Sequence, residues 1–214
     1  MTQELTKEPM DAEVQNILDN EGYGGFVRGL FNRSGDLSKD FTHAVLGLTT
    51  ECYELLKATD HVNGVEEGGD LMFYYVALDQ VLQDCEWLDG TVQEAEAYRG
   101  HPSVEYSLGH TAQETLDFAL NQLQDIAKRW VGYGKQPEGT ATDITLHAGA
   151  ALRAAIQVSC LRFGSPDNLE TVLIRANIAK LLKRYKGKKF NAEHAVNRDV
   201  AAERVVLEDA AAGS

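Results

Sequence analysis

The sequence lacks several features that would place it in a familiar functional class. No stretch approaches the about 20 apolar residues of a membrane-spanning helix, and no secretory signal precedes Gly22. The three cysteines (Cys52, Cys85 and Cys160) are an odd number without metal-ligand spacing, so we expect reduced thiols. These absences favour a cytoplasmic protein without a membrane partner.

The common catalytic motifs are also missing. The chain contains no P-loop, no H-E-x-x-H zinc motif and no G-x-S-x-G elbow. The glycines between Glu21 and Asp36 do not form a G-x-G-x-x-G loop after a strand, which excludes a dinucleotide-binding turn. No run of strand-like segments occurs, so the sequence predicts an all-α fold.

Positive charge is scarce but concentrated. The chain has 20 Lys and Arg against 33 Asp and Glu, a net charge of −13, which disfavours a nucleic-acid polymer as partner. Seven of these cations lie between positions 175 and 189: Arg175, Lys180, Lys183, Arg184, Lys186, Lys188 and Lys189. Such a patch suits a small polyanion, although cations also stabilise the end of a helix without further function. We assign Lys180 to function and expect Lys186, Lys188 and Lys189 to be mainly solvated.

The most informative feature present is a set of two acidic pairs, Glu51-x-x-Glu54 and Glu67-x-x-Asp70. Residues three apart share one face of a helix, so two adjacent helices would gather four carboxylates. Their mutual repulsion would be relieved by a hard divalent cation, Mg²⁺ or its substitute Mn²⁺. The alternative is that these are solvated faces, or that Glu67 and Asp70 are first-turn acids favoured by the helix dipole.

The residues around the first pair place it beside a core. Apolar residues at helical spacing form one stripe: Ala44, Leu48, Cys52, Leu55 and Leu56. A second stripe beside it contains His43, Gly47, Glu51 and Glu54. The segment Asp60–Gly64 predicts a turn, and the helix after Asp70 is apolar almost all round. The carboxylates are therefore expected to border the core.

The remaining chain predicts a single domain at 37–210, preceded by an extension at 1–36 and followed by a tail at 211–214. A weak helical pattern occurs around Val14–Leu18, and Glu21–Asp36 predicts a covering loop, or a lid whose aromatic residues and arginines approach a nucleotide. We expect long helices at about 37–60, 66–86, 106–131, 142–163, 168–186 and 191–210.

Two of these helices, 106–131 and 142–163, follow a break at Gly100-His-Pro102 and form a second pair. The first of them offers Glu114 and Asp117, whereas the second has no acidic motif. The pair is either a degenerate duplicate of the acidic pair or an unrelated helical hairpin.

The acidic pairs resemble the signature of a known family. E-x-x-E followed by E-x-x-D is similar to the motif of the MazG-like all-α nucleoside triphosphate pyrophosphohydrolases. The segment Asn177-Ile-Ala-Lys180-Leu-Leu-Lys-Arg184-Tyr185 resembles the N-x-x-K helix of that family, and 190–203 resembles the C-terminal segment of bacteriophage-type members. The order of the three elements makes the match fairly specific. An inserted helical hairpin, about 87–165, departs from the compact pattern.

The resemblance implies a helical bundle, assembled as a dimer or tetramer, in the cytoplasm (of the host if phage-encoded). It implies Mg²⁺-dependent cleavage of a nucleoside triphosphate between its α and β phosphates, giving a monophosphate and pyrophosphate. The implied metal ligands are Glu51, Glu54, Glu67 and Asp70, and the implied substrate contacts are Asn177, Lys180, Arg184 and Tyr185. Glu54 is our candidate for accepting the proton of water, and Lys180 for neutralising the leaving pyrophosphate.

Other functions compete with this one. A ferritin-like di-iron protein needs Glu-x-x-His pairs, and none of the six histidines follows a glutamate at that spacing. A helical nucleotide-binding or adaptor protein, and a hydrolase of alarmone nucleotides, stay open. We favour deoxynucleoside triphosphates as the substrate, in line with the phage-type resemblance.

Overall fold

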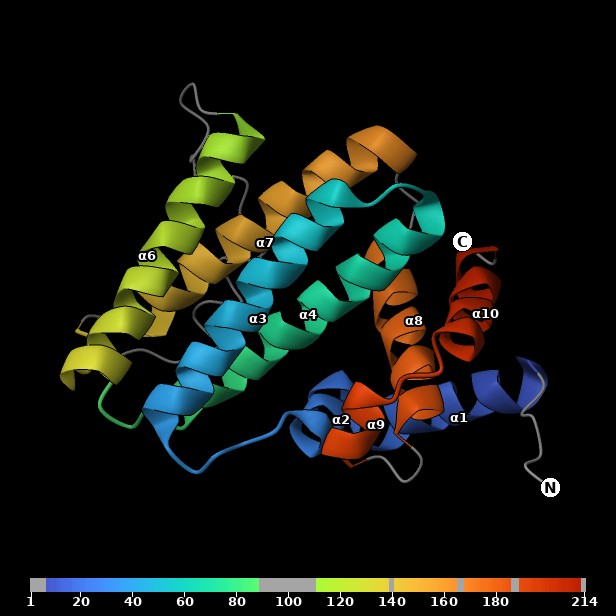
Figure 1. The fold of residues 1–214 in the computed structure, drawn as a ribbon, viewed down its shortest axis with the longest axis horizontal. Coiled ribbons are helices and arrows are strands. Elements are labelled where there is room, and N and C mark those ends of the chain that lie inside the picture. The colour runs from blue at the N-terminus through green and yellow to red at the C-terminus, as the bar shows by residue number, and fades with distance from the viewer. Residues whose placement is uncertain (1–6, 89–110, 139–140, 165–167, 186–188, 213–214) are drawn as a thin grey trace.

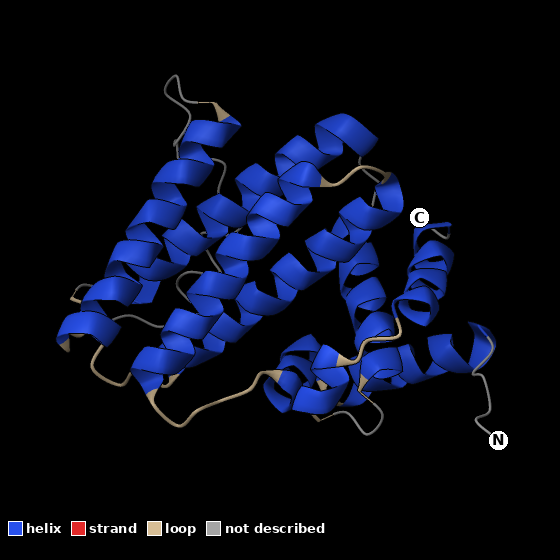
Figure 2. Ribbon diagram, viewed as in Figure 1, coloured by secondary structure: helices blue, strands red, loops and turns tan. Residues whose placement is uncertain are grey.

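The computed structural model describes residues 7–88, 111–138, 141–164, 168–185 and 189–212. Within these ranges every regular element is a helix, which confirms the expected all-α class (Figure 2). The helices are α1 (Lys7–Asn20), α2 (Gly22–Leu30), α3 (Leu37–Lys57), α4 (His61–Gln83), α6 (Ala112–Tyr133), α7 (Ala141–Phe163), α8 (Leu169–Arg184), α9 (Ala192–Val196) and α10 (Val200–Ala212). The predicted break at Gly100-His-Pro102 lies outside the described residues.

The helices form a bundle with a smaller group at one end (Figure 1). Helices α3, α4, α6 and α7 pack against one another, so the hairpin α6–α7 lies on the pair that carries the acidic motifs. Helices α8 and α10 pack together and against α4, while α1 and α2 contact each other and reach α8 and α4 respectively. Side chains of α8 and α10 can therefore contact the acidic residues of α4.

The apolar stripe of α3 is confirmed as core. Ala44, Leu48 and Cys52 are fully buried, and Leu55 is nearly so. Burying each large apolar side chain contributes roughly 1.5–3 kcal/mol, so this stripe fixes the rotation of α3 about its axis. Glu51 consequently lies at the edge of the core with α4 beside it.

Helix α4 begins earlier than the sequence predicted. Asp60 caps it, because its carboxylate accepts a hydrogen bond from the backbone N–H of Asn63 at 2.8 Å, and the helix then starts at His61. The expected turn through Gly64 was wrong. Glu67 and Asp70 thus lie beyond the first turn, which rules out their interpretation as first-turn acids.

The predicted loop at 21–36 was wrong in part, because 22–30 form helix α2. Phe26 and Leu30 are buried with residues of α1 and α8, so they hold this helix against the bundle. Neither arginine of the lid hypothesis lines the cavity described below: Arg28 is exposed, and Arg33 forms ion pairs with Asp40 at 2.9 Å and Asp84 at 2.6 Å. Packing supplied by the rest of the chain overrides the low helix propensity of the glycines.

The expected helix at 191–210 is two helices, α9 and α10, with residues 197–199 between them. Asp199 starts the second helix, because its carboxylate accepts a hydrogen bond from the N–H of Ala202 at 3.1 Å. The break matters for the site because it turns Arg198 toward α8 and α4.

The hairpin acids have local partners. Glu114 forms a capping box with Thr111 at the start of α6. Asp117 accepts a hydrogen bond from the Tyr53 hydroxyl at 3.2 Å. The first contact caps α6, and the second ties α6 to α3.

Among the residues that the structure describes, one helix meets the length and composition of a membrane span, contrary to our expectation that no stretch approaches one. It is α7, over Asp143–Phe163, with mean hydropathy 1.3. Its residues Ile144, Ala151 and Ala155 belong to the same buried core as α3 and α4. Packing in the bundle core accounts for the apolar residues on the buried side of α7. The three cysteines are free, as expected.

Candidate metal and phosphate site

Three of the four predicted ligands come together. One carboxylate oxygen from each of Glu51, Glu54 and Glu67 lies within 4.8 Å of the others. The first two come from α3 and the third from α4, two helices in direct contact. Asn63, one turn before Glu67, donates a hydrogen bond to its Oε1 at 2.9 Å and so fixes one oxygen. We call these three side chains the glutamate triad.

Burial and mutual repulsion make it unfavourable for Glu51 and Glu67 of the triad to be ionised without a cation. Burial and the nearby carboxylates of Asp70, Glu54 and Glu67 raise the pKa of Glu51 to about 9. Burial, Asp70 and Glu66 raise the pKa of Glu67 to about 7. A set of clustered carboxylate oxygens is also the donor set that Mg²⁺ and Mn²⁺ prefer. The residues present therefore fit a hard divalent cation.

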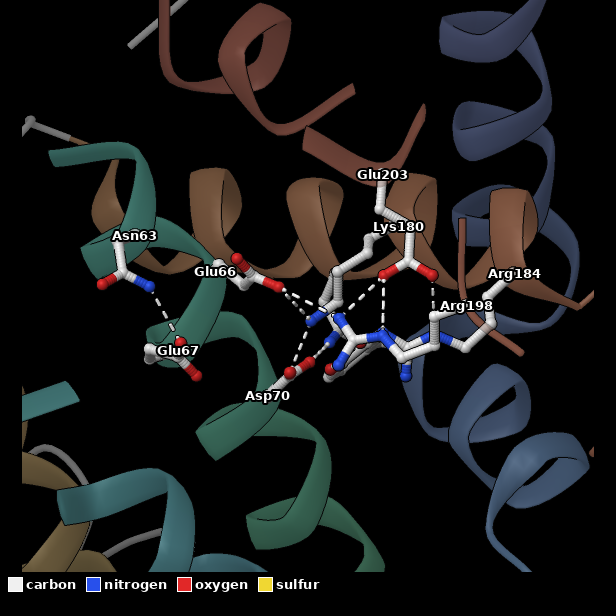
Figure 3. A network of polar contacts seen from close by, with 10 residues as sticks. Asn63, Glu66, Glu67, Asp70, Lys180, Arg184, Arg198 and Glu203 are labelled. Atoms are coloured by element: carbon white, nitrogen blue, oxygen red, sulfur yellow. Dashed lines mark hydrogen bonds and ion pairs between the residues drawn. The ribbon is translucent and has the colours of Figure 1, made fainter. Parts of the chain in front are cut away.

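Asp70 is not a member of the triad, although its charge acts on Glu51 and Glu67. Its Oδ2 forms an ion pair with the Lys180 ammonium, and its Oδ1 accepts a hydrogen bond from the Asn177 amide at 2.7 Å. Lys180 is fully buried and also approaches Glu66 Oε1 at 3.5 Å. Asp70 is therefore held by α8 on the side away from Glu67, as Figure 3 shows.

Two glycines allow α8 to come this close. A Cβ at Gly69 would lie 3.0 Å from the Leu173 carbonyl oxygen and 3.0 Å from Asn177 Cβ. A Cβ at Gly68 would lie 2.8 Å from the Leu173 side chain. An alanine at Gly69 would require the facing atoms of α8 to move by a few tenths of an ångström, whereas at Gly68 the end of the Leu173 side chain would have to shift.

Tyr23 of α2 completes this arrangement. Its hydroxyl donates a hydrogen bond to Asn177 Oδ1 at 2.9 Å, which orients the amide so that its NH₂ faces Asp70. Burial, and then the charge of Asp70, raise the pKa of Tyr23 well above its usual value, so the hydroxyl keeps its proton. No sequence pattern pointed to this residue beyond its place in a glycine-rich segment.

A cavity of about 220 Å³ opens above these groups. Its lining includes the glutamate triad, Glu66 and Asp70, together with Arg184, Tyr185 and Arg198. Two of the four expected substrate contacts, Arg184 and Tyr185, are thus on its wall. Asn177 and Lys180 are not in the lining, since both lie behind Asp70 and bind it. No described residue of α6 or α7 lines the cavity.

An aromatic wall borders the cavity beside the triad. The Phe31 ring stacks on His43 with centroids 4.7 Å apart, and Tyr74 meets both rings edge-on at 6.5 and 5.9 Å. All three line the cavity, as does Phe73. Of the segment first expected to be a lid, only Leu30, Phe31 and Asn32 reach the lining. The wall offers flat apolar surface next to the charged groups.

The aromatic wall depends on Gly47. A Cβ at this position would lie 2.2 Å from two ring atoms of Tyr74, so Gly47→Ala must displace that ring. We expect a loss of about 1–3 kcal/mol in the free energy of unfolding, as in other overpacked cores. Gly132→Ala is the control, because nothing lies within 4 Å of a Cβ there and the gain in helix propensity is up to about 1 kcal/mol. Urea unfolding followed by circular dichroism measures both; equal effects would contradict this packing.

Figure 3 shows a further network that the sequence did not predict. Glu203 of α10 accepts hydrogen bonds from Arg184 at 3.0 and 2.7 Å, and from Arg198 at 2.8 and 3.3 Å. Arg198 also approaches Glu66 at 3.5 Å. Of the basic stretch, Lys189 is exposed as expected, while Lys186 and Lys188 lie outside the described residues.

The raised pKa values predict how stability depends on pH without a cation. Between the ordinary value of 4.5 and their folded values of about 7 and about 9, Glu67 and Glu51 keep protons that the unfolded chain has lost. The free energy of unfolding therefore falls as pH rises through this window. We expect the melting temperature in EDTA to drop from about pH 6 to about pH 9, and millimolar Mg²⁺ to restore it at the upper end.

Glu51→Gln provides the control for this pH dependence. It removes one titrating carboxyl, so the drop in melting temperature should be shallower and the gain from Mg²⁺ smaller. A pH profile in EDTA identical to that of the unsubstituted protein would show that Glu51 titrates normally.

Comparisons of the chain with protein-family models, with curated proteins and with solved structures gave no match. The interpretation of this site therefore depends on its geometry and on the chemistry of the residues that line it.

Proposed function

We propose that this protein is a divalent-cation-dependent nucleoside triphosphate pyrophosphohydrolase. The reaction is nucleoside triphosphate plus water giving nucleoside monophosphate plus pyrophosphate. One observation carries the proposal: a single cavity has three clustered carboxylates, an aromatic wall and two arginines on its lining. These suit a cation, a base and a phosphate chain respectively.

Charge explains why a cation belongs in the reaction. Among the residues that the structure describes, five carboxylates and two arginines line the cavity, and these groups alone would repel an anionic substrate. Glu51, Glu54 and Glu67 would hold Mg²⁺, which supplies charge for the phosphate oxygens and acidifies water. A cation would stabilise Glu51 most, because burial and the neighbouring carboxylates make its ionised form the least favourable of the three.

The side chains have distinct tasks in this proposal. Glu54 is the exposed member of the triad and accepts the proton of the water that attacks the α-phosphorus. Asp70 is held by Lys180 and Asn177, which limits its movement as the substrate enters. During cleavage, negative charge builds up on the phosphates in the cavity, in front of Asp70. The buried ammonium of Lys180, which lies behind Asp70, stabilises that charge.

The aromatic wall fits the nucleoside. A base has an apolar face that stacks on rings such as those of Phe31 and Tyr74, and Tyr74 keeps its phenol proton because burial and Glu51 raise its pKa to about 12. We favour deoxynucleoside triphosphates. Assembly of the chain as a homodimer or tetramer is part of the same proposal.

The test is a panel of ribo- and deoxynucleoside triphosphates incubated with Mg²⁺ in ¹⁸O-labelled water. We expect monophosphate and pyrophosphate in equal amounts, with the label in the monophosphate. A diphosphate and free phosphate as first products would overturn the proposed bond. Binding of nucleotides without any turnover would favour the nucleotide-binding or adaptor alternative, and activity only on tetraphosphate alarmones would change the substrate class.

A further inference from the structure

The cavity contains a paired arginine site that neither the acidic motifs nor the triad requires. Arg198 lies in the short segment between α9 and α10, and Arg184 lies at the end of α8. Both line the cavity, and both bind the same carboxylate, that of Glu203. We call Arg184 and Arg198 the arginine pair.

Glu203 makes the pair possible. Two guanidinium groups this close repel each other unless an anion lies between them. Glu203 is 2% exposed, and hydrogen bonds from the arginines lower its pKa although burial opposes this, so it stays ionised. The carboxylate neutralises one of two positive charges. Glu66 Oε1, 3.5 Å from Arg198, offsets part of the second positive charge, so the pair keeps only part of its charge at the cavity wall.

The arginines also keep unused donors. Glu203 is bound through Nε and Nη2 of each guanidinium. Among the residues that the structure describes, no hydrogen bond from Nη1 of either side chain is formed. Each guanidinium has five N–H donors in a planar fork that matches phosphate oxygens. The pair is consequently prepared to bind a second anion in addition to Glu203.

The position of the pair matches the far end of a phosphate chain. In the view of Figure 3, Asp70 lies between Glu67 and the two arginines. Glu67 of the triad and the arginine pair thus lie on opposite sides of Asp70 in that view, and all of these side chains line one cavity. A chain of phosphates that begins at the triad would extend toward the arginines.

We propose that Arg198 and Arg184 form a subsite for the terminal phosphate of the substrate, with Glu203 as the residue that positions them. This inference rests on the proposed function for the identity of the substrate. It makes the site selective for three linked phosphates over two, because only the third phosphate reaches the pair. Arg198 and Glu203 thereby set substrate length and take no part in the bond that breaks.

A purely structural role for Arg198 would be to tie α10 to the bundle. Arg204, on α10 itself, already makes such a tie with Asp60 at 3.3 Å, and it also pairs within α10 with Glu208 at 3.1 Å. Its side chain is 38% exposed, close to the 37% of Arg198, but it does not line the cavity. Arg204→Ala is therefore a matched control for Arg198→Ala.

The experiment is titration calorimetry in Mg²⁺ buffer with two probes, inorganic tripolyphosphate and inorganic pyrophosphate. Arg198→Ala should weaken tripolyphosphate binding by roughly ten- to a hundredfold, the loss of one charge-assisted contact, while changing pyrophosphate binding little. Arg204→Ala should leave both affinities unchanged. Glu203→Gln should reduce the preference for tripolyphosphate, and circular dichroism checks that it stays folded.

Equal weakening of both probes in Arg198→Ala, or no weakening, would overturn the inference, as would a lack of tripolyphosphate binding by the unsubstituted protein. The proposed function is tested separately by pyrophosphate release from nucleotides. If Arg198 makes binding length-selective but the protein turns over no nucleotide, the phosphate subsite is supported and the proposed enzymatic function is contradicted. If the protein turns over nucleotides and Arg198→Ala keeps the full preference for triphosphates over diphosphates, the proposed function is supported and the phosphate subsite is contradicted.

Discussion

Glu51→Gln is expected to lower turnover of the best triphosphate by roughly a thousandfold or more. The substitution keeps the shape of the side chain but removes a charged oxygen ligand from the triad. Loss of metal-based charge stabilisation costs several kcal/mol, and each 1.36 kcal/mol is tenfold in rate. Asp70→Asn should also lose most activity, because it breaks the ion pair with Lys180. Steady-state kinetics at saturating Mg²⁺ measures both.

The control for Glu51→Gln is Glu86→Gln, an exposed glutamate after α4 that does not line the cavity. Its turnover should match that of the unsubstituted protein. Stability provides a second readout, since Glu51→Gln removes like-charge repulsion and should raise the melting temperature in EDTA. Turnover near normal in both Glu51→Gln and Asp70→Asn would show that the chemistry takes place elsewhere.

Lys180→Ala is expected to lower kcat/KM by roughly a hundredfold or more, as for loss of one electrostatic stabiliser. Its ammonium is fully buried between Asp70 and Glu66, so truncation leaves two carboxylates without their shared cation. Removing one partner of a buried ion pair costs about 3–5 kcal/mol, so Lys180→Ala also tests the fold. Lys180→Met, which keeps the length of the stem, separates the electrostatic loss from the packing loss.

Lys189→Ala is the matched control, because Lys189 is an exposed member of the same basic stretch. It should have little effect on kcat/KM. Equal losses in Lys180→Ala and Lys189→Ala would mean that the stretch acts as a diffuse positive field. If Lys180→Met stays folded and keeps full activity, the lysine is a structural partner of Asp70 and nothing more.

The helices were predictable where apolar residues recur at helical spacing. This spacing placed α3, α4 and α8 and the stripe that puts Glu51 at the core edge. It failed at the start of α4 because a single cap, Asp60, decides that boundary. It failed for α2 because the segment is helical only through burial of Phe26 and Leu30 against other helices.

Within the site, the sequence indicated which acids matter but not what each one touches. Spacing along α4 placed Glu67 and Asp70 on one face, yet Asp70 is drawn to Lys180 and Asn177 by the approach of α8 over Gly69. Glu203 and Tyr23 were missed for the same reason. Their roles arise only from contacts across the bundle, which no local pattern reports.

The bonds of Asp70 also bear on the order in which the protein can fold. Asp70 and its partners are far apart in the chain: Asn177 is 107 residues later and Lys180 is 110 residues later. A ribosome therefore completes α3 and α4 well before α8 exists. Non-local contacts form slowly because loop-closure entropy must be overcome first. Until α8 has been synthesised, Asp70 lacks both side chains that bind it, so we expect this part of the site to form late.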